Sequence, residues 1–443
     1  MQNFLDDLVA SGRERGLQVA ACLDGELIVD AWAGTAGPDT LFPVFSVSKG
    51  IGATVVHILV DRGLVGYDDR VAELWPAFGK HGKDVITVGQ VLEHSAGVPF
   101  FPAGLTPDEI ADEKLVAGLI AEQPLAWEPG TQTGYHSLTF GYLVDHIVRG
   151  ASGQTLGEAV HALIAQPLGI ADELFVVPPV QFADRLAEVD DSAFDPSVFG
   201  ETFQRVVGGM TIGSMVPRRT TPPGRSWSMA APLPFGATMT ARAGARLYGV
   251  LATGGEPLLS AETLAAATRI RRRDADVVVG VPVLKSYGYS HGDEVTGGRP
   301  EAFGFGGLGG SEAYADPTTR LSFAFTHNRL TPPTEVDSAI ELAKRVRALA
   351  ASGLTAVDLG RQFVRVAVGQ VVADEQVDEG VLAGRGAGED EAVGCIREEG
   401  AAAPGQVAVP TEEDVEEDAV EPAGTQRLAG PDANGDESEE QTG

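Results

Sequence analysis

The sequence predicts an α+β fold: one antiparallel sheet built from N- and C-terminal segments and flanked by helices, with an inserted helical subdomain. Strand-like apolar runs occur at 17–34 and return after residue 276, whereas helical periodicity fills most of the stretch between them. No repeat with a period of about 20–50 residues is present. The economical assembly therefore pairs the two groups of strands in a single sheet.

The N-terminal elements are predicted to be a helix and a hairpin. Residues 1–16 have the pattern of a short amphipathic helix with early acidic residues, not the basic-then-apolar order of a signal peptide. Residues 17–34 carry two apolar runs on either side of an Asp-Gly pair. This pair is typical of a two-residue hairpin turn, so we expect two adjacent antiparallel strands here.

The middle of the chain is predicted to be helical, and strands follow it. The expected helices span 47–64, 87–94, 107–122, 138–150, 155–165 and 241–255. Residues 196–234 are rich in Gly, Pro, Ser and Thr, which predicts a long surface excursion. Further strands are expected at 276–284, 285–290, 311–317 and 320–328, and a last helix at 334–353.

Composition divides the chain into a predicted folded domain, 1–352, and an acidic, largely disordered extension, 353–443. Residues 374–443 hold 21 acidic and 3 basic residues, and so carry a net −18 of the formal −31. The remaining body is also acidic, which argues against nucleic acid as a partner. The two cysteines are far apart in sequence, and no apolar run reaches the ~18–20 residues that span a bilayer. We therefore expect a cytoplasmic protein with free thiols and no membrane contact.

The segment Ser46-Val47-Ser48-Lys49 begins one of the predicted helices and has two interpretations. Residues three apart on a helix face the same way, so Lys49 lies one turn beyond Ser46. In the structural interpretation, Ser46 is a helix cap and Lys49 is a solvated side chain. The alternative makes Ser46 a nucleophile, and Lys49 a buried, uncharged amine that accepts its proton. The four-residue pattern alone does not decide between them.

Two other segments favour the chemical interpretation. Tyr135-His136-Ser137 follows a Pro-Gly turn and precedes a predicted helix, so a phenol there is able to project into a cleft and shuttle a proton. The stretch 303–317 begins with closely spaced glycines just before a strand. Glycines allow a substrate to approach the backbone, and they leave an N–H free to help form an oxyanion hole.

These three elements, in this order, resemble the serine hydrolases related to class C β-lactamases. That superfamily includes penicillin-binding-protein-type peptidases, family VIII carboxylesterases and several acyltransferases. The likeness covers residues 15–350 and includes landmarks at 88–99, 127–131, 167–170 and 245–255. Any one of these landmarks is ordinary, but the ordered set is specific.

The resemblance implies a role for each matching residue. Ser46 corresponds to the acylated nucleophile, Lys49 to its proton partner, and Tyr135 to the tyrosine that acts as general base and acid. The backbone N–H groups of Ser46 and Leu308 correspond to the oxyanion hole. No metal or organic cofactor is implied.

Two departures from the β-lactamase pattern bear on the substrate. Ser137 stands where β-lactamases have the Asn of Tyr-x-Asn, and Phe305-Gly306-Gly307 stands where they have Lys-Thr-Gly. Losing that lysine removes a charge-assisted contact to a substrate carboxylate, worth roughly 1.5–3 kcal/mol. An aromatic residue followed by two glycines is similar to the family VIII esterase and transacylase branch. We expect an uncharged substrate pocket that includes these four residues and His136.

The sequence therefore predicts acyl transfer through a covalent serine ester, with hydrolysis of a small-molecule carboxylic ester as the default. The first alternative is a transacylase or amide synthase that moves an acyl group to an alcohol or amine acceptor in natural-product biosynthesis. The second alternative is a catalytically inactive binding homologue. The intact Ser46, Lys49 and Tyr135 set argues against this last interpretation.

Other polar signals are interpreted as structural. The stretch 288–292 matches Gly-x-Ser-x-Gly, but the residues after it are too rich in Gly, Pro and charge to begin the required helix. Ser290 is therefore expected at the end of a strand. His94 and His136 are expected to be structural or at the rim of the site and not to act as bases, and His57 is expected to pack in the core.

Overall fold

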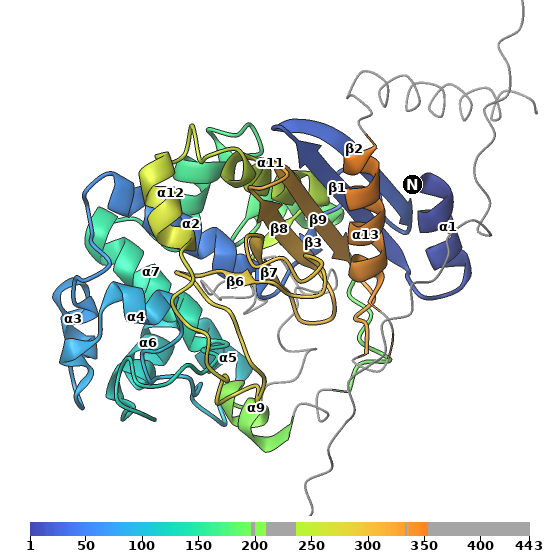
Figure 1. Ribbon diagram of the computed structural model, residues 1–443. Helices are drawn as coiled ribbons and strands as arrows, with labels where there is room; N and C mark the ends of the chain where they lie inside the picture. The colour runs from blue at the N-terminus through green and yellow to red at the C-terminus, as the bar shows by residue number, and fades with distance from the viewer. Residues whose placement is uncertain (196–199, 210–235, 333–334, 336, 353–443) are drawn as a thin grey trace, which may run out of the picture. The chain divides into compact units, whose positions relative to one another are not determined.

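The structure is a computed structural model that describes residues 1–195, 200–209, 236–332, 335 and 337–352. The predicted acidic extension lies outside these residues, as do 196–199 and 210–234 of the predicted excursion. Within the excursion, Gly200–Val206 form a short helix. Within the described residues, a large antiparallel sheet and a helical region lie side by side (Figure 1).

One six-stranded sheet joins the two ends of the predicted domain, in the order β2-β1-β9-β8-β7-β6. The antiparallel register pairs Val19 with Phe325, so an N-terminal strand is hydrogen-bonded to a strand about 300 residues away in sequence. This confirms the predicted assembly of the sheet. The strands are β1 (Gly16–Leu23), β2 (Glu26–Gly34), β6 (Ser290–His291), β7 (Phe303–Gly306), β8 (Glu312–Asp316) and β9 (Leu321–His327).

The predicted hairpin between β1 and β2 is present. Asp24 and Gly25 form its turn with φ of 53° and 84°, the left-handed conformation that the tightest hairpin turns require at both central positions. Asp and Gly are among the residues that tolerate this conformation best, which explains why the pair was informative.

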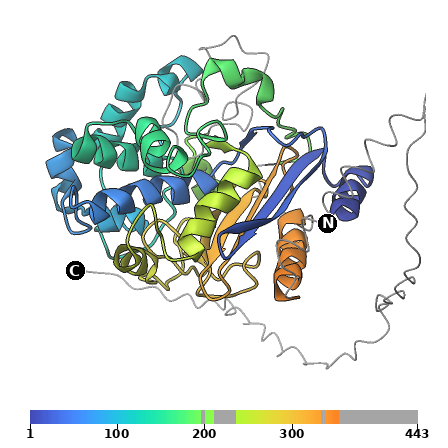
Figure 2. The same ribbon diagram turned by 90° about the horizontal axis from the view of Figure 1, so that it is seen from above.

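Helices cover both faces of the sheet (Figure 2). On one face, α1 (Gln2–Ala10) and α13 (Ser338–Ala351) bury the large side chains of Phe323 and Phe325. On the other face, α11 (Ala241–Ala252) packs closely because small residues meet there. A Cβ added at Gly244 would lie only 2.9 Å from the Cβ of Ala324. Side chains that alternate along each strand thus serve two different cores.

The helical region is organised around α2 (Val47–Asp61), whose residues 47–59 are all buried. A helix that is buried on every side belongs to the interior of a domain, and α2 packs against α7 and the sheet. The other helices of the described residues are α3 (Val71–Leu74), α4 (Val88–Leu92), α5 (Pro107–Ala111), α6 (Glu113–Glu122), α7 (Thr139–Ser152), α8 (Leu156–Val160), α9 (Gly200–Val206) and α12 (Ala261–Thr268).

Several predicted elements differ from those observed. The strand predicted at 276–284 is a tight turn, because the Asp276 carboxylate accepts hydrogen bonds from the N–H groups of Val278 and Val279. The helix predicted at 107–122 is two helices, and Asp112 caps the second. The helix predicted at 155–165 ends in one π-helical turn, His161–Ala165.

A small three-stranded sheet was not predicted from the sequence. It has the order β3-β5-β4 and consists of β3 (Phe42–Pro43), β4 (Leu174–Phe175) and β5 (Thr238–Met239). Strands of two residues leave no periodicity to detect. Among the described residues, no helix is both long and apolar enough to cross a membrane.

Gln18 is buried on β1, and its side chain hydrogen-bonds to the loop at 37–40 and to the start of α11. Its Nε2 donates to the carbonyl oxygens of Gly37, Pro38 and Thr40 at 2.7–3.2 Å, and its Oε1 accepts from the N–H of Ala241 at 2.9 Å. The N–H of Ala241 is buried and the three carbonyl groups are in partly buried hydrogen bonds, so loss of the amide would leave the Ala241 N–H without a partner.

We expect Gln18→Met to lower the free energy of unfolding by about 1–3 kcal/mol, because it leaves buried polar groups without a partner. Urea denaturation measures this loss. Gln181→Met, at an exposed position, is the matched control and is expected to stay within about 0.5 kcal/mol of the unmodified protein. Equal midpoints for the two variants would contradict the structural role given to Gln18.

Candidate active site

Ser46 stands at the tip of a strained turn that leads into α2. The preceding residue, Phe45, has φ of 47°, a conformation that bulky side chains rarely adopt. The turn is held by Ser48, whose hydroxyl donates to the carbonyl of Phe45 and accepts from the N–H of Ala237. Backbone strain in a structure is concentrated at functional sites, where the surroundings enforce it.

The Ser46 hydroxyl does not cap the helix that it begins. Its Oγ instead lies 2.9 Å from the Nζ of Lys49 and 2.5 Å from the Oη of Tyr135. The structure therefore brings together the three side chains that the sequence predicted to converge. We call them the Ser46–Lys49–Tyr135 cluster.

Lys49 is fully buried, and its pKa is held well below the ordinary lysine value, first by burial and second by the nearby charge of Lys285. Its only hydrogen-bond partner among the described residues is Ser46. Burial favours the neutral amine of Lys49 over its ammonium form, and no carboxylate of the described residues compensates for the lost hydration. The amine is thus able to accept the proton of the hydroxyl that contacts it.

Tyr135 is presented by a loop just before α7, and its position is set by another loop of the chain. Its N–H donates to the carboxylate of Asp276 at 3.0 Å. The hydroxyls of Ser46 and Ser137 hydrogen-bond to its phenol, yet burial is the larger effect and raises the pKa of Tyr135 well above its usual value. The phenol is therefore protonated at rest.

A strap formed by residues 270–285 fixes the loop that carries Tyr135. Arg272 donates to the hydroxyl of Thr133 at 2.7 Å and to the carbonyl of Gly130 at 3.0 Å. The Thr133 carbonyl accepts from the N–H of Val277 at 2.9 Å. Neither Arg272 nor Asp276 was singled out from the sequence, because the strap lies more than 130 residues away and carries no motif.

The glycine-rich segment after β7 lies directly against the turn before Ser46. A Cβ at Gly307 would lie 2.4 Å from the carbonyl oxygen of Val44, so only glycine fits there. The N–H of Gly307 is used by the carbonyl of Ser311. The N–H groups of Ser46 and Leu308 donate no hydrogen bond within the part of the chain that the structure describes. Two unused N–H groups thus come from two backbone segments in contact.

Phe305 and Ser137 lie at the cluster, as expected from the sequence. The rings of Phe305 and Tyr135 stack with centroids 6.2 Å apart, and the Nζ of Lys49 is 5.7 Å from the Phe305 ring. Gly306 faces away from them, because a Cβ there would lie 2.3 Å from a carboxylate oxygen of Glu312 on β8. Gly306 thus allows close packing within the sheet.

The structure corrects the placement of His136. It is fully buried, its Nδ1 donates to the carbonyl of Gly134 at 2.7 Å, and its Nε2 accepts from the N–H of Val98 at 3.0 Å. Both ring nitrogens are used inside the protein, so none is left for a substrate. His136 therefore does not line the pocket and instead braces the loop that carries Tyr135.

Two other histidines and Ser290 lie as predicted. His57 packs in the core, where it contacts the Tyr67 hydroxyl and the Tyr287 carbonyl, and burial lowers its pKa to about 4. His94 is buried between the rings of Tyr135 and Phe140. Ser290 pairs with Gly304 at the edge of the sheet and begins no helix.

A second amine at the site was not predicted. Lys285 extends from the strap, and its Nζ lies 5.5 Å from the centroid of the Tyr135 ring and 5.6 Å from that of Phe305. The expected uncharged pocket therefore contains an ionisable group. Lys285 lies 20 residues before Phe305, the first residue of the segment that lacks the lysine of Lys-Thr-Gly.

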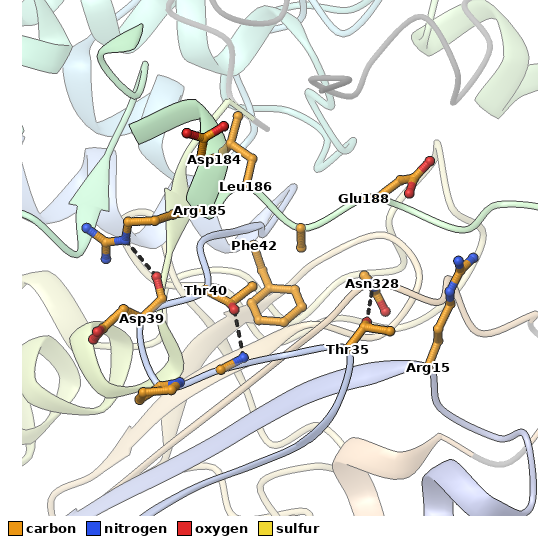
Figure 3. A pocket seen from close by; sticks show the side chains of 13 residues that line it. Arg15, Thr35, Asp39, Thr40, Phe42, Asp184, Arg185, Leu186, Glu188 and Asn328 are labelled. Carbon is orange, nitrogen blue, oxygen red and sulfur yellow. Dashed lines mark hydrogen bonds between the residues drawn. The ribbon is translucent and has the colours of Figure 1, made fainter. Parts of the chain in front are cut away.

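One cavity and one cluster of possible metal ligands are separate from this site. A cavity of about 430 Å³ lies between β3 and the loop at 184–188, and none of the predicted site residues lines it (Figure 3). Glu113, Asp145 and His146 place possible ligand atoms within 4.8 Å of one another. Arg149 already donates to both carboxylates, so a guanidinium occupies the place of a metal ion.

Comparisons with known proteins agree with this architecture. The beta-lactamase family model matches residues 1–348. The esterase/beta-lactamase LipL of Mycobacterium tuberculosis is 35% identical over 343 residues, which cover 72% of this chain and 78% of LipL. A penicillin-binding protein homologue from Caulobacter crescentus is 32% identical with a TM-score of 0.68, over 77% of this chain and 94% of that one. A family VIII carboxylesterase structure is 30% identical with a TM-score of 0.67, over 76% and 94% respectively.

These likenesses place the protein among the serine hydrolases of the β-lactamase fold, as its motifs predicted. The chain belongs to the beta-lactamase family. The prediction that it is an enzyme of the carboxylesterase type is also confirmed.

We expect Gly307→Ala to reduce ester hydrolysis by about 100-fold, because the added methyl group pushes the segment at 306–310 away from the turn before Ser46. Gly118→Ala is the matched control, since a Cβ at this position on α6 has nothing within 4 Å. The control should keep full activity and gain up to about 1 kcal/mol of stability. Full activity in the Gly307 variant would show that this contact does not set the site.

Proposed function

We propose that the protein hydrolyses small-molecule carboxylic esters through an acyl-enzyme formed on Ser46. The observation that carries this proposal is the position of the Ser46 Oγ between a buried amine at 2.9 Å and a phenol at 2.5 Å. The sequence similarity to esterases supports the same reaction.

In the first step, the Ser46 Oγ attacks the ester carbonyl carbon as its proton passes to the neutral Nζ of Lys49. The carbonyl oxygen becomes an oxyanion, which the N–H groups of Ser46 and Leu308 stabilise. Oxyanion-hole donors of this kind are worth about 2.7–4 kcal/mol each when removed. The Ser46 N–H is also at the start of α2, where the helix dipole favours negative charge.

In the second step, the tetrahedral intermediate collapses and its carbon–oxygen bond to the leaving group breaks. The alkoxide takes the phenol proton of Tyr135, and the proton on Lys49 then restores the phenol. A water molecule then attacks the acyl carbon, and its proton passes to Lys49 and Tyr135. Release of the acid returns the proton to Ser46, so the cycle consumes only ester and water.

Transfer to an alcohol or amine acceptor is the alternative outcome of the same acyl-enzyme. It is separated from hydrolysis by incubating the protein with an ester and a primary alcohol in water, and following the products by mass. Free acid as the sole product supports the esterase. A dominant new ester would assign the protein to the transacylases.

We expect Ser46→Ala to lower turnover of a short-chain p-nitrophenyl ester by about 10⁴-fold or more, because no other hydroxyl replaces the nucleophile. The acyl-enzyme should be visible as an adduct on the intact wild-type protein in a mass spectrum, and be absent from the variant. Ser290→Ala is the control for the Gly-x-Ser-x-Gly motif and should keep its activity. Loss of turnover in this control with retention in Ser46→Ala would reverse the assignment. Turnover no faster than the uncatalysed rate in the wild type and in both variants would point to the inactive-homologue interpretation.

The pH profile should report the Lys49 amine. Acid protonates Lys49 and removes the base, so kcat/KM for a neutral ester should rise with pH, with a midpoint well below the usual lysine pKa of 10.5. Steady-state rates between about pH 4 and pH 10 measure this midpoint. Lys49→Arg carries a permanent charge and should be inactive across the whole range. A wild-type midpoint near 10 would mean that Lys49 is an ordinary charged lysine.

A further inference from the structure

Lys285 is placed at the Ser46–Lys49–Tyr135 cluster by the strap. Its backbone N–H donates to the carbonyl of Arg272 at 3.1 Å, and its own carbonyl accepts from the N–H groups of Arg271 and Arg272. A further bridge joins it to Ser290 on β6. The backbone of Lys285 is thus held on both sides, and its side chain is only 5% exposed.

The amine of Lys285 contacts rings and makes no ion pair within the described residues. Its Nζ lies near the faces of Tyr135 and Phe305, where a cation is attracted by the ring electrons. Desolvating a charge at this position is costly, so an unpaired buried lysine calls for an explanation.

The groups around the two lysines assign the positive charge to Lys285. Burial lowers the pKa of Lys285, and Asp276 opposes part of this effect. One carboxylate oxygen of Asp276 is buried without a hydrogen bond inside the described region. Among the residues that the structure describes, no carboxylate raises the pKa of Lys49. The pKa values of His94 and His136 are lowered by burial and, further, by Lys285, so both histidines are neutral. Tyr135 is a neutral phenol at rest.

We propose that Lys285 is the resident cation of the active site, which keeps Lys49 in its neutral form and stabilises the phenolate that forms on Tyr135 during leaving-group departure. This inference rests on the proposed function of the cluster. Lys285 acts through Lys49 and Tyr135 and touches neither the nucleophile nor the scissile bond, so it is a positioning residue.

Two effects follow from one charge. A fixed ammonium near Lys49 disfavours a second ammonium, since like charges in a buried site repel strongly. The same ammonium lies near Tyr135, where it offsets the negative charge that appears when the phenol gives up its proton. Lys285 therefore links the base of the first step to the acid of the second.

The test compares Lys285→Met with Lys285→Arg on a neutral p-nitrophenyl ester over the full pH range. In Lys285→Met, kcat/KM should fall about 100-fold at neutral pH, and the acid limb of the profile should move upward by about one pH unit or more. Lys285→Arg keeps the charge, so its limb should stay at the wild-type position. Thermal melting checks that each variant is folded, and Lys285→Gln serves as a second neutral variant if Lys285→Met is not.

The outcomes separate this inference from the proposed function. An unmoved acid limb in a folded, neutral variant overturns the role of Lys285 while ester hydrolysis by Ser46 stands. A wild-type protein without Ser46-dependent turnover defeats the proposed function itself. The same variants are also tested on an ester that bears a carboxylate on its acyl chain. A loss confined to that ester, with an unmoved limb, would make Lys285 a receptor for substrate charge and would also overturn the proposal.

Discussion

The site depends on one interaction, the contact between the Ser46 hydroxyl and an amine that has been removed from water. Lys49 lies on a helix that is buried on every side, so the cost of an ammonium there is set by the whole core. An exposed lysine at the same position would be charged and unable to take a proton from serine. Packing of α2 against α7 and the sheet therefore determines the chemistry, because it decides which form of Lys49 exists.

Five chain segments far apart in sequence meet around this contact, and contacts of their backbone groups align them. The turn before Ser46 is fixed to residue 237, the loop with Tyr135 is fixed to the strap at Asp276, and the glycine segment lies against Val44. Side chains such as Ser48, Arg272 and His136 add bonds from polar atoms to backbone groups. This construction leaves the hydroxyl, the amine and the phenol free of structural duties.

The sequence predicted features that depend on neighbouring residues, and it did not predict contacts between residues far apart in the chain. Asp24-Gly25 specified its hairpin turn, and the spacing of Ser46 and Lys49 placed both groups on one helical face. The valine-rich run at 276–284 suggested a strand, but one carboxylate, that of Asp276, turns the chain there and leaves Val277, Val279 and Val281 exposed. Lys285 was missed for the same reason, since its approach to Tyr135 depends on that turn and on no motif. His136 was misplaced because its position next to Tyr135 does not show that it faces inward.

The left-handed backbone of Phe45 limits which mutations the active site can tolerate. Glycine would adopt the same angles without penalty, whereas phenylalanine holds them only while its ring is anchored in the core. A protein selected for stability alone would have glycine at position 45 or a backbone without this strain. The buried ring of Phe45 holds the strained turn in place and so keeps Ser46 rigid. Mutations that loosen the core around this ring should therefore lower catalytic activity before they unfold the molecule.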